Sequence, residues 1–368
     1  MTLRLGPSPF PATVPWPSTP DPSPPSRAPL ASDKGGRARR RFFGIDELMS
    51  ARPTPECSAG VLLRGLPATT ESARPAQGAR SAARHVAARV DTPVAGLSAP
   101  RSPFHAVAQM AYRHYAPLLE SALGGMVALA GDLGEVDGRA KRPASAANRL
   151  ERVVGNGWAT RIASTREAVS HLWDAIGTRL VLDNPTRERV DLFVDRVAHA
   201  ILEGRLSVKQ VHSLTGHGGV PYFTEADLSR LQSAASAVGK PIGVASRRYD
   251  TGYTIGAIYV EYQGGVGGEI QLIGPQVLAV AEKEHLVYDA FLGKPAPGDG
   301  FHEVRQAARS LTESQREAYL GYLNQNYIHA RQAELGGPLA RAVRPAGIPL
   351  ALDMDSLAIA LHASGEAL

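Results

Sequence analysis

The sequence predicts a mixed α/β domain, in which a β-sheet of a few strands is flanked by helices, behind a long N-terminal segment without a core of its own. Short apolar runs bounded by Gly, Pro or Asn, such as residues 254–262, are typical of buried strands. Stretches with apolar residues at helical spacing, such as residues 190–201, lie between these runs. Because strands follow helices along the chain, we expect one sheet with helices packed around it.

The N-terminal segment differs from the rest of the chain in composition. Residues 1–103 hold 17 of the 28 prolines and show no sustained apolar period. They also hold 14 Lys and Arg against 7 Asp and Glu, so the net charge of +5 divides into +7 here and −2 in the remainder. Such a segment cannot bury enough apolar surface to offset its ordering entropy, so we expect residues 1–102 to be a disordered leader.

The sequence also constrains the compartment. The single cysteine, Cys57, excludes internal disulfides and cysteine-based metal sites. No run of about 18 apolar residues exists, so we expect no membrane span and no membrane partner. Prolines at positions 7, 9 and 11 interrupt the N-terminus and leave no Sec signal core. The leader resembles those of type III secreted effectors. We therefore expect an effector delivered into a host or target cell, whose leader contacts a host target or a secretion chaperone; the alternative is the bacterial cytoplasm.

Ordered structure is expected from Pro103 onward. A helix begins at Phe104 and is kinked or split at Pro117. Pro143 suits the first turn of a further helix, which presents Ser145 and Arg149 on one face because they are four residues apart.

The central part of the chain reads as strands and helices in alternation. A buried strand is expected within residues 173–182, entered through a turn at Gly177. Asn184 and Pro185 predict a helix start, as N-cap and first helical residue. The apolar stripe of that helix consists of Val190, Phe193, Val194, Val197 and Ile201.

Further elements are expected toward the C-terminus. Strands are predicted at residues 208–214, 242–244, 254–262 and 269–273, and a helix capped by Thr224 runs through Val238. The Gly-rich run 264–268 reads as a hairpin turn, because a strand and no Lys-Ser/Thr follows it. Pro275 opens a helix, a Gly/Pro loop spans 293–300, and helices follow at roughly 302–335 and 353–364. We divide this part into a domain at 103–295 and a helical extension at 296–368.

Three polar clusters stand out against this pattern. Their members are Arg139, Lys141, Ser145 and Arg149 in the first; Asp174, Gly177 and Arg179 in the second; and Gly252, Tyr253, Glu269 and Gln271 in the third. Taken one by one, such residues are more often a solvated helix face, a turn or an ordinary strand position. Taken together, their order along the chain and their spacing within each cluster indicate one functional site.

The series resembles the synthetase domain of the RelA/SpoT family, the enzymes that make (p)ppGpp-type alarmones. The pattern of that family is R-x-K-x3-S-x3-K/R, then D-x2-G-x-R, then G-Y, then E-x-Q. The resemblance spans Arg139 to Gln271. It implies a nucleotidyltransferase-like mixed sheet and an ATP:nucleotide 3′-pyrophosphokinase. Such an enzyme uses Mg²⁺, moves the β,γ-diphosphate of ATP to the 3′-hydroxyl of a purine nucleotide such as GDP, GTP or an adenine nucleotide, and releases AMP.

The resemblance assigns the ATP side of the site. Arg139 and Arg179 would hold the adenine between them, which suits planar and weakly hydrated guanidinium groups. Lys141, Ser145 and Arg149 match the positions that bind the ATP phosphates. Because phosphoryl transfer depends on placement and charge neutralisation, these cations are what the reaction requires.

The resemblance also assigns the metal and the acceptor side. Asp174 and Glu269 match the Mg²⁺ ligands, and carboxylate oxygen is what this ion prefers. Glu269 would also take the proton of the acceptor hydroxyl. Tyr253 would stack on the acceptor base, with Gln271 supporting that pocket. A helix beside the site is suggested by Glu282, His285 and Tyr288.

Two departures from the family pattern bear on the acceptor. The family has a histidine four positions after the Gly-Tyr tyrosine, where it helps to hold the acceptor's phosphates, and this chain has Ala257. Arg247 and Arg248 are candidates to supply the missing charge. The usual E-x-Q-x-R-T also reads E-I-Q-L-I-G here, which removes an arginine without touching the metal ligands.

Three functions remain open at this point. The first is the pyrophosphokinase, as an effector, a toxin or a housekeeping enzyme. The second is a toxin that pyrophosphorylates the 3′ end of tRNA, which the −2 charge of the ordered part makes an unfavourable expectation. The third is a synthetase fold that has lost activity and serves as a binding module, which would fit the missing histidine.

Overall fold

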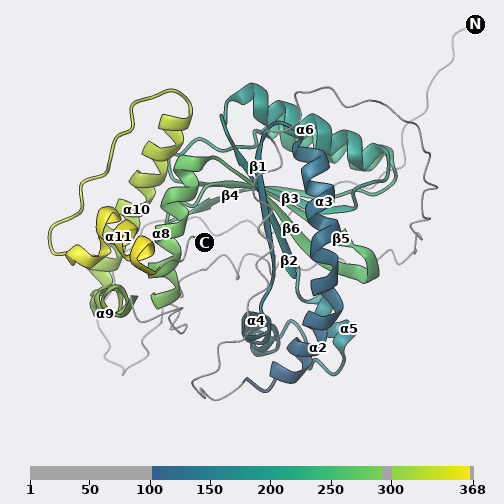
Figure 1. Cartoon of the computed structure of the whole chain (residues 1–368), viewed down its shortest axis with the longest axis horizontal. Helices are drawn as coiled ribbons and strands as arrows, with labels where there is room; N and C mark the ends of the chain where they lie inside the picture. Colours follow the sequence, from purple (N-terminus) through teal and green to yellow (C-terminus); the bar gives the residue numbers. More distant parts are fainter. Residues whose placement is uncertain (1–101, 292–300, 365–368) are drawn as a thin grey trace, which may run out of the picture. The chain divides into compact units, whose positions relative to one another are not determined.

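The computed structural model describes residues 102–291 and 301–364. The predicted leader, apart from Ser102, and the predicted loop 293–300 lie outside these residues. The described part contains one six-stranded mixed sheet with strand order β1-β2-β6-β5-β3-β4 (Figure 1). Its strands are β1 (Gly134–Ala140), β2 (Ile176–Leu182), β3 (Val208–Gly216), β4 (Gly243–Tyr249), β5 (Ile255–Tyr262) and β6 (Val266–Ile273).

Pairing in the sheet is parallel between β2 and β6 and between β3 and β4, and antiparallel elsewhere. The predicted mixed sheet is therefore confirmed, and all five expected strands are present. The turn predicted at Gly177 is wrong, because Gly177 lies within β2 and pairs with both neighbouring strands. The edge strand β1 was not predicted, because its sequence is Gly-Glu-Val-Asp-Gly-Arg-Ala and lacks an apolar alternation. A strand that pairs on only one side and leaves its side chains half-exposed does not need that alternation.

The helices of the described residues surround this sheet (Figure 1). They are α2 (His105–Tyr115), α3 (Leu119–Ala130), α4 (Pro143–Gly155), α5 (Thr165–Ser170), α6 (Arg187–Leu202), α7 (Glu225–Ala237), α8 (Pro275–Phe291), α9 (His302–Ser310), α10 (Glu313–Glu334) and α11 (Met354–Ser364). The 3-10 turn Ala116–Leu118 separates α2 from α3, so the break predicted at Pro117 is confirmed. None of the described helices is long and apolar enough to cross a membrane.

The two predicted helix caps have opposite outcomes. Thr224 accepts a hydrogen bond from the Asp227 backbone N–H in a complete capping box, as expected for the start of α7. The predicted start of α6 at Asn184 and Pro185 is wrong, because the N-cap is Thr186. The carbonyl of Pro185 accepts a hydrogen bond from Arg331 at 3.1 Å, so this residue belongs to a tertiary contact.

The predicted hairpin between β5 and β6 is confirmed, with Tyr262 paired to Val266. The turn is the 3-10 segment Gln263–Gly265, in which Gly264 has a φ of 77°. The following glycines lie within β6. A Cβ on Gly268 would approach Cε2 of Tyr262 to 2.3 Å, so this position requires glycine, which has no Cβ.

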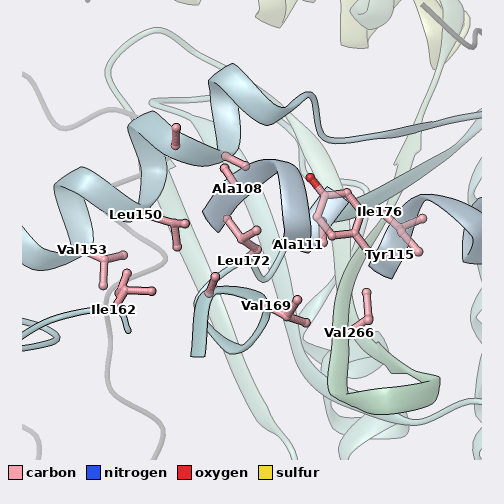
Figure 2. Packing of buried hydrophobic residues seen from close by; sticks show 14 of the residues in the cluster. Ala108, Ala111, Tyr115, Leu150, Val153, Ile162, Val169, Leu172, Ile176 and Val266 are labelled. Atoms are coloured by element: carbon pink, nitrogen blue, oxygen red, sulfur yellow. The ribbon is translucent and has the colours of Figure 1, made fainter. Parts of the chain in front are cut away.

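Two clusters of buried apolar side chains support the site. The first joins α2, α4 and α5 to the ends of β2 and β6, as Figure 2 shows for Ala108, Leu150, Leu172, Ile176 and Val266. The second joins α8 to α9, α10 and α11. The C-terminal helices therefore share a core with the helix that the sequence placed beside the site. The domain boundary at 295 stays a prediction.

The end of α10 is anchored by a buried polar network. The Glu334 carboxylate accepts hydrogen bonds from the Tyr222 hydroxyl at 2.6 Å and from the Val277 backbone N–H at 2.9 Å, in the first turn of α8. Arg331 donates to the same carboxylate at 3.1 Å. Because every partner is buried, this network fixes α10 against the start of α8.

Candidate functional site

One face of the sheet carries the strand residues that the motifs selected. Residues directly opposite in neighbouring strands share a face, and every second residue along a strand returns to it. One row across the sheet is Asp137, Arg179, Gln271, Ala257 and His212. The next row on this face is Arg139, Gly177, Glu269, Tyr259 and Gln210. We call this the site face.

Lys141 and Asp174 meet at the ends of β1 and β2. The Lys141 ammonium donates a hydrogen bond to the Asp174 carboxylate, and the Lys141 backbone N–H donates to the Ala175 carbonyl at 2.8 Å. The Tyr115 hydroxyl donates to the Lys141 carbonyl. Burial alone would raise the pKa of Asp174, but Lys141 and, more weakly, Arg149 lower it below its usual value. The carboxylate is therefore kept charged.

The helix α4 carries the other two residues assigned to the ATP phosphates. Ser145 and Arg149 both lie on it, as predicted, but only Ser145 is exposed. Arg149 is 4% exposed, and its guanidinium lies 5.7 Å from the centre of the Trp158 ring. Arg149 also lies near enough to Asp174 to lower the pKa of that carboxyl. The first two motif clusters therefore meet in space.

Glu269 lies in the centre of the sheet, on β6. The Gln271 amide donates a hydrogen bond to the Glu269 carboxylate at 2.9 Å. Burial raises the pKa of Glu269, and the charge of Asp174 raises it further, against hydrogen bonds from Gln271 and Tyr259 and the charge of Lys141. The carboxylates of Asp174 and Glu269 repel each other, and Lys141 attracts both. Such a group is suited to bind a cation through the carboxylates and anionic oxygens through the lysine.

The two arginines assigned to the adenine lie on the site face, two residues apart in register. Arg139 is paired with Gly177, whose missing side chain leaves room above β2, and Arg179 follows two residues later. The Nε atom of Arg179 lies 3.6 Å from the Asp137 carboxylate, and this buried atom makes no hydrogen bond. Both arginines therefore belong to the β1–β2 end of the site face. Their stacking on a base stays a prediction.

Helix α8 closes this end of the site, as the sequence predicted. Burial raises the pKa of Glu282, and the charge of Arg179, which lies near enough to act on this carboxyl, opposes that rise. The ring of His285 lies 6.3 Å from that of Tyr253, edge to face. Glu282 and His285 are therefore beside the motif residues.

Tyr253 is more enclosed than its assigned role suggests. Its side chain is 4% exposed, and the rings of Tyr249, His285 and Tyr327 lie around it at centroid distances of 6.3, 6.3 and 6.1 Å. Burial raises the pKa of the Tyr253 hydroxyl, and the charge of Glu269 raises it further. Little of the Tyr253 ring is therefore open for a purine to stack on in this structure.

Helix α10 contributes residues that the motifs do not contain. Asn324 donates a hydrogen bond to the His217 carbonyl at 3.0 Å, and a Cβ on Gly252 would lie 2.5 Å from its Cα atom. The Tyr327 hydroxyl donates to the buried Glu284 carboxylate. Nothing in the local sequence of α10 indicates that it packs on the Gly252-Tyr253 turn, because that contact depends on tertiary packing alone.

The donor set fits a hard divalent cation. Asp174 and Glu269 offer carboxylate oxygens near each other, and Mg²⁺ commonly uses one or two carboxylates together with water and phosphate oxygens. Within residues 102–291 and 301–364, no group of three or more His, Cys, Asp or Glu side chains is placed to hold a metal.

No protein-family model matches the chain, and no curated protein matches it. Solved structures do. The small alarmone synthetase 1 from Bacillus subtilis is 16% identical over 55% of this chain and 86% of that chain, with a TM-score of 0.31. A GTP pyrophosphokinase family protein from Streptococcus pneumoniae is 17% identical over 60% of this chain and 95% of that chain, with a TM-score of 0.31.

A third similar structure is the complex between the type VI effector Tas1 and its immunity protein, at 18% identity over 66% of this chain and 100% of that chain, with a TM-score of 0.30. The chain thus resembles solved proteins with alarmone synthetase and pyrophosphokinase names, which is the resemblance that the motifs predicted. At such identities and TM-scores these likenesses carry no argument about activity, which depends on the chain's own residues.

Proposed function

We propose that this protein is an ATP:nucleotide 3′-pyrophosphokinase. The observation that carries the proposal is that the half-buried carboxyl of Glu269 lies near enough to the Lys141–Asp174 ion pair to feel the charge of both residues. These residues belong to three clusters that are far apart in the sequence. A charged lysine beside two carboxylates, with Arg139 and Arg179 on the same sheet face, supplies the cations, metal ligands and base that the reaction requires.

ATP would bind over the ends of β1 and β2. Lys141 and Arg149 would neutralise its phosphates, with Ser145 as a hydrogen-bond donor at the start of α4. Arg139 and Arg179 would hold the adenine. Asp174 and Glu269 would hold Mg²⁺, which when bound offsets negative charge on the phosphate oxygens.

The acceptor would approach from the side of β5. Its 3′-hydroxyl oxygen attacks the β-phosphorus of ATP while Glu269 takes the hydroxyl proton. A bond forms between that oxygen and the β-phosphorus, and the bond from the β-phosphorus to the oxygen bridging it to the α-phosphorus breaks. AMP leaves with that oxygen, and the acceptor carries a 3′-diphosphate. Tyr259, which is hydrogen-bonded to Glu269, keeps this carboxyl oriented.

A non-catalytic binding module is the second candidate. The enclosure of Tyr253 and the absence of a histidine at Ala257 favour it. The presence of both predicted metal ligands and of the Lys141–Asp174 pair favours the enzyme, because two carboxylates that share one lysine in a half-buried site are costly to keep without a use.

The experiment that tests the proposal follows the γ-phosphate of ATP. The full chain is incubated with Mg²⁺ and [γ-³²P]ATP, alone or with GDP, GTP, AMP, ADP or bulk tRNA. We expect label to move to a nucleotide with release of one AMP per transfer. Glu269→Gln should lose transfer. Arg248→Ala should keep it, because Arg248 pairs with Thr215 and therefore lies on the sheet face opposite to the site face, where it cannot supply the charge that the sequence suggested. Binding of ATP without transfer to any acceptor would favour the binding module, and transfer to tRNA alone would favour the tRNA 3′-end reaction.

We also propose that the protein is an exported effector. The support is the Pro-rich basic composition of residues 1–103, which differs from the near-neutral remainder. A reporter protein fused to residues 1–102 should be exported from a bacterium that has a contact-dependent secretion system. A fusion of the same reporter to a known effector is the positive control. If the strain exports this control but keeps the residue 1–102 fusion in its cytoplasm, the protein is a cytoplasmic one and the proposal of export fails.

A further inference from the structure

Helices α8 and α10 together cover the ring of Tyr253. The Tyr327 ring of α10 lies 6.1 Å from it and the His285 ring of α8 lies 6.3 Å from it, both edge to face. The preceding residue is also in close contact with α10, because a Cβ on Gly252 would lie 2.5 Å from Cα of Asn324. Only 4% of the Tyr253 side chain is exposed. The side chain that the sequence assigned to the acceptor base is therefore covered in this structure.

One carboxyl joins the three segments that meet here. Glu284 of α8 is 5% exposed and accepts a hydrogen bond from the Tyr327 hydroxyl of α10. Its second hydrogen-bond partner is the side chain of Thr251, in the turn that carries Tyr253. The contact between the two helices is therefore shared with this turn, so a change at Glu284 acts on all three segments.

The turn is the segment of the three that is free to move. Residues 250–254 lie between β4 and β5 and belong to neither strand. Helices α8 and α10, by contrast, are held together by the second apolar cluster and by the hydrogen bond from Val277 to Glu334. A displacement of the turn away from α10 would uncover Tyr253 and admit water to Glu284 at the same time.

The surroundings of Glu284 offer hydroxyl groups. Its charge acts on the hydroxyls of Tyr253 in the turn and of Tyr319 and Tyr327 on α10. Burial raises the pKa of each of these hydroxyls, so they stay protonated. In the described part of the chain, no basic group is among the causes that set the pKa of Glu284. The nearest titratable imidazole, His285, faces the Tyr253 ring. An ionised Glu284 therefore has hydroxyl partners and no compensating cation.

A proton on Glu284 favours the covered arrangement. Burial raises the pKa of Glu284 from 4.5 to about 7. Once water reaches the carboxyl, the proton is held less tightly, so a rise in pH from 4.5 to about 7 increases the population of the uncovered arrangement. Below pH 4.5 the carboxyl is protonated in both arrangements and has no such effect.

We propose that Glu284, Thr251 and Tyr327 form a pH-sensitive latch, which keeps Tyr253 covered while Glu284 is protonated and lets the turn open when Glu284 is ionised. The inference rests on the proposed function in one respect, the use of the Tyr253 ring by a purine nucleotide. It adds regulation to that site, because the acceptor side would be covered at acidic pH and more often open above neutral pH.

The test measures amide hydrogen exchange of the full chain by peptide mass spectrometry at pH 5 and pH 8. Wild type is compared with Glu284→Gln, which is neutral at both pH values, so intrinsic exchange and the titration of His285 cancel in the comparison. In peptides covering residues 249–254, the ratio of wild-type to variant exchange rate should rise at least about tenfold from pH 5 to pH 8, the factor that one pKa unit supplies. This exchange should precede that of α6 in the core, as local opening requires.

A second pair of variants tests the hydrogen bond itself. Tyr327→Phe keeps the ring but loses the donor to Glu284, and should raise exchange of residues 249–254 about fivefold already at pH 5. Tyr322→Phe, whose hydroxyl donates to Asp353 on the same helix, is the matched control and should leave that exchange unchanged. A ratio that does not change with pH, or exchange of the turn and of α6 at one common rate, would overturn the latch.

Nucleotide binding separates the latch from the proposed function. Titration calorimetry with GDP and with ADP should show one of them binding wild type at least about fivefold more tightly than Glu284→Gln at pH 8, and equally at pH 5. If exchange behaves as expected but binding at pH 8 is equal, the latch stands and the role assigned to Tyr253 in the reaction fails. Transfer of ³²P by a wild-type chain whose exchange ratio is unchanged has the opposite meaning.

Discussion

Glu284 on α8 offers a prediction about stability that the structure makes quantitative. Its side chain is 5% exposed and accepts a hydrogen bond from the Tyr327 hydroxyl on α10. Burial raises the pKa of Glu284 from 4.5 to about 7, although hydrogen bonds from Tyr327 and Thr251 oppose the rise. We consider the replacement Glu284→Gln, which is neutral at every pH and keeps an oxygen for Tyr327.

The sign of the effect follows from proton linkage. The folded chain holds the Glu284 proton more tightly than the unfolded chain, so the unfolded chain ionises first and the free energy of unfolding falls as the pH rises from 4.5 to about 7. Below pH 4.5 both states are protonated and the residue contributes nothing. Above pH 7 the whole difference in pKa between the folded and unfolded chain lowers the free energy of unfolding. At about 1.4 kcal/mol per pKa unit this destabilisation is about 3 kcal/mol.

The assay is urea unfolding of wild type and Glu284→Gln at several pH values. The variant should be more stable by under about 1 kcal/mol at pH 5 and by about 3 kcal/mol at pH 8. Glu317→Gln, an exposed carboxylate on the same helix as Tyr327, is the matched control and should show no such trend. Equal gains at pH 5 and pH 8, or a loss of stability at pH 8, would refute the assigned burial of an ionisable Glu284.

Three further predictions concern the site and its supports. Lys141→Ala removes the cation beside Asp174 and should lower kcat of diphosphate transfer about 10²- to 10³-fold; kcat within threefold of wild type would contradict its role. Glu334→Ala leaves buried donors without their acceptor and should lower the free energy of unfolding in urea by about 3–5 kcal/mol. A decrease below about 1 kcal/mol would show that the position of α10 does not depend on this network. Gly252→Ala should lower the free energy of unfolding more than Gly239→Ala. Both glycines have positive φ, but only a Cβ at position 252 would meet another backbone, 2.5 Å from Cα of Asn324. Equal decreases for the two variants would mean that α10 does not pack tightly on this turn.

The sequence alone determined the residue types of the site and part of their geometry. Strand alternation put Glu269 and Gln271 on one face of β6, and the four-residue spacing put Ser145 and Arg149 on one helix. Both follow from local periodicity, which the backbone imposes without help from distant contacts. Local pattern failed at β1, whose polar edge strand has no apolar alternation, and at Asn184, because α6 begins two residues later than the cap signal and the Pro185 carbonyl accepts a tertiary hydrogen bond.

Only the tertiary structure decided which of these faces meet. The strand order β1-β2-β6-β5-β3-β4 places Arg179 opposite Gln271 and His212 opposite Ala257, although both pairs are far apart in the chain. The enclosure of Tyr253 by α10 belongs to the same class. Strand order, register and helix docking are set by the burial of the whole apolar surface at once. A short motif contains none of that information, so the sequence determined the residue types of the candidate site and the fold decided which of them lie together.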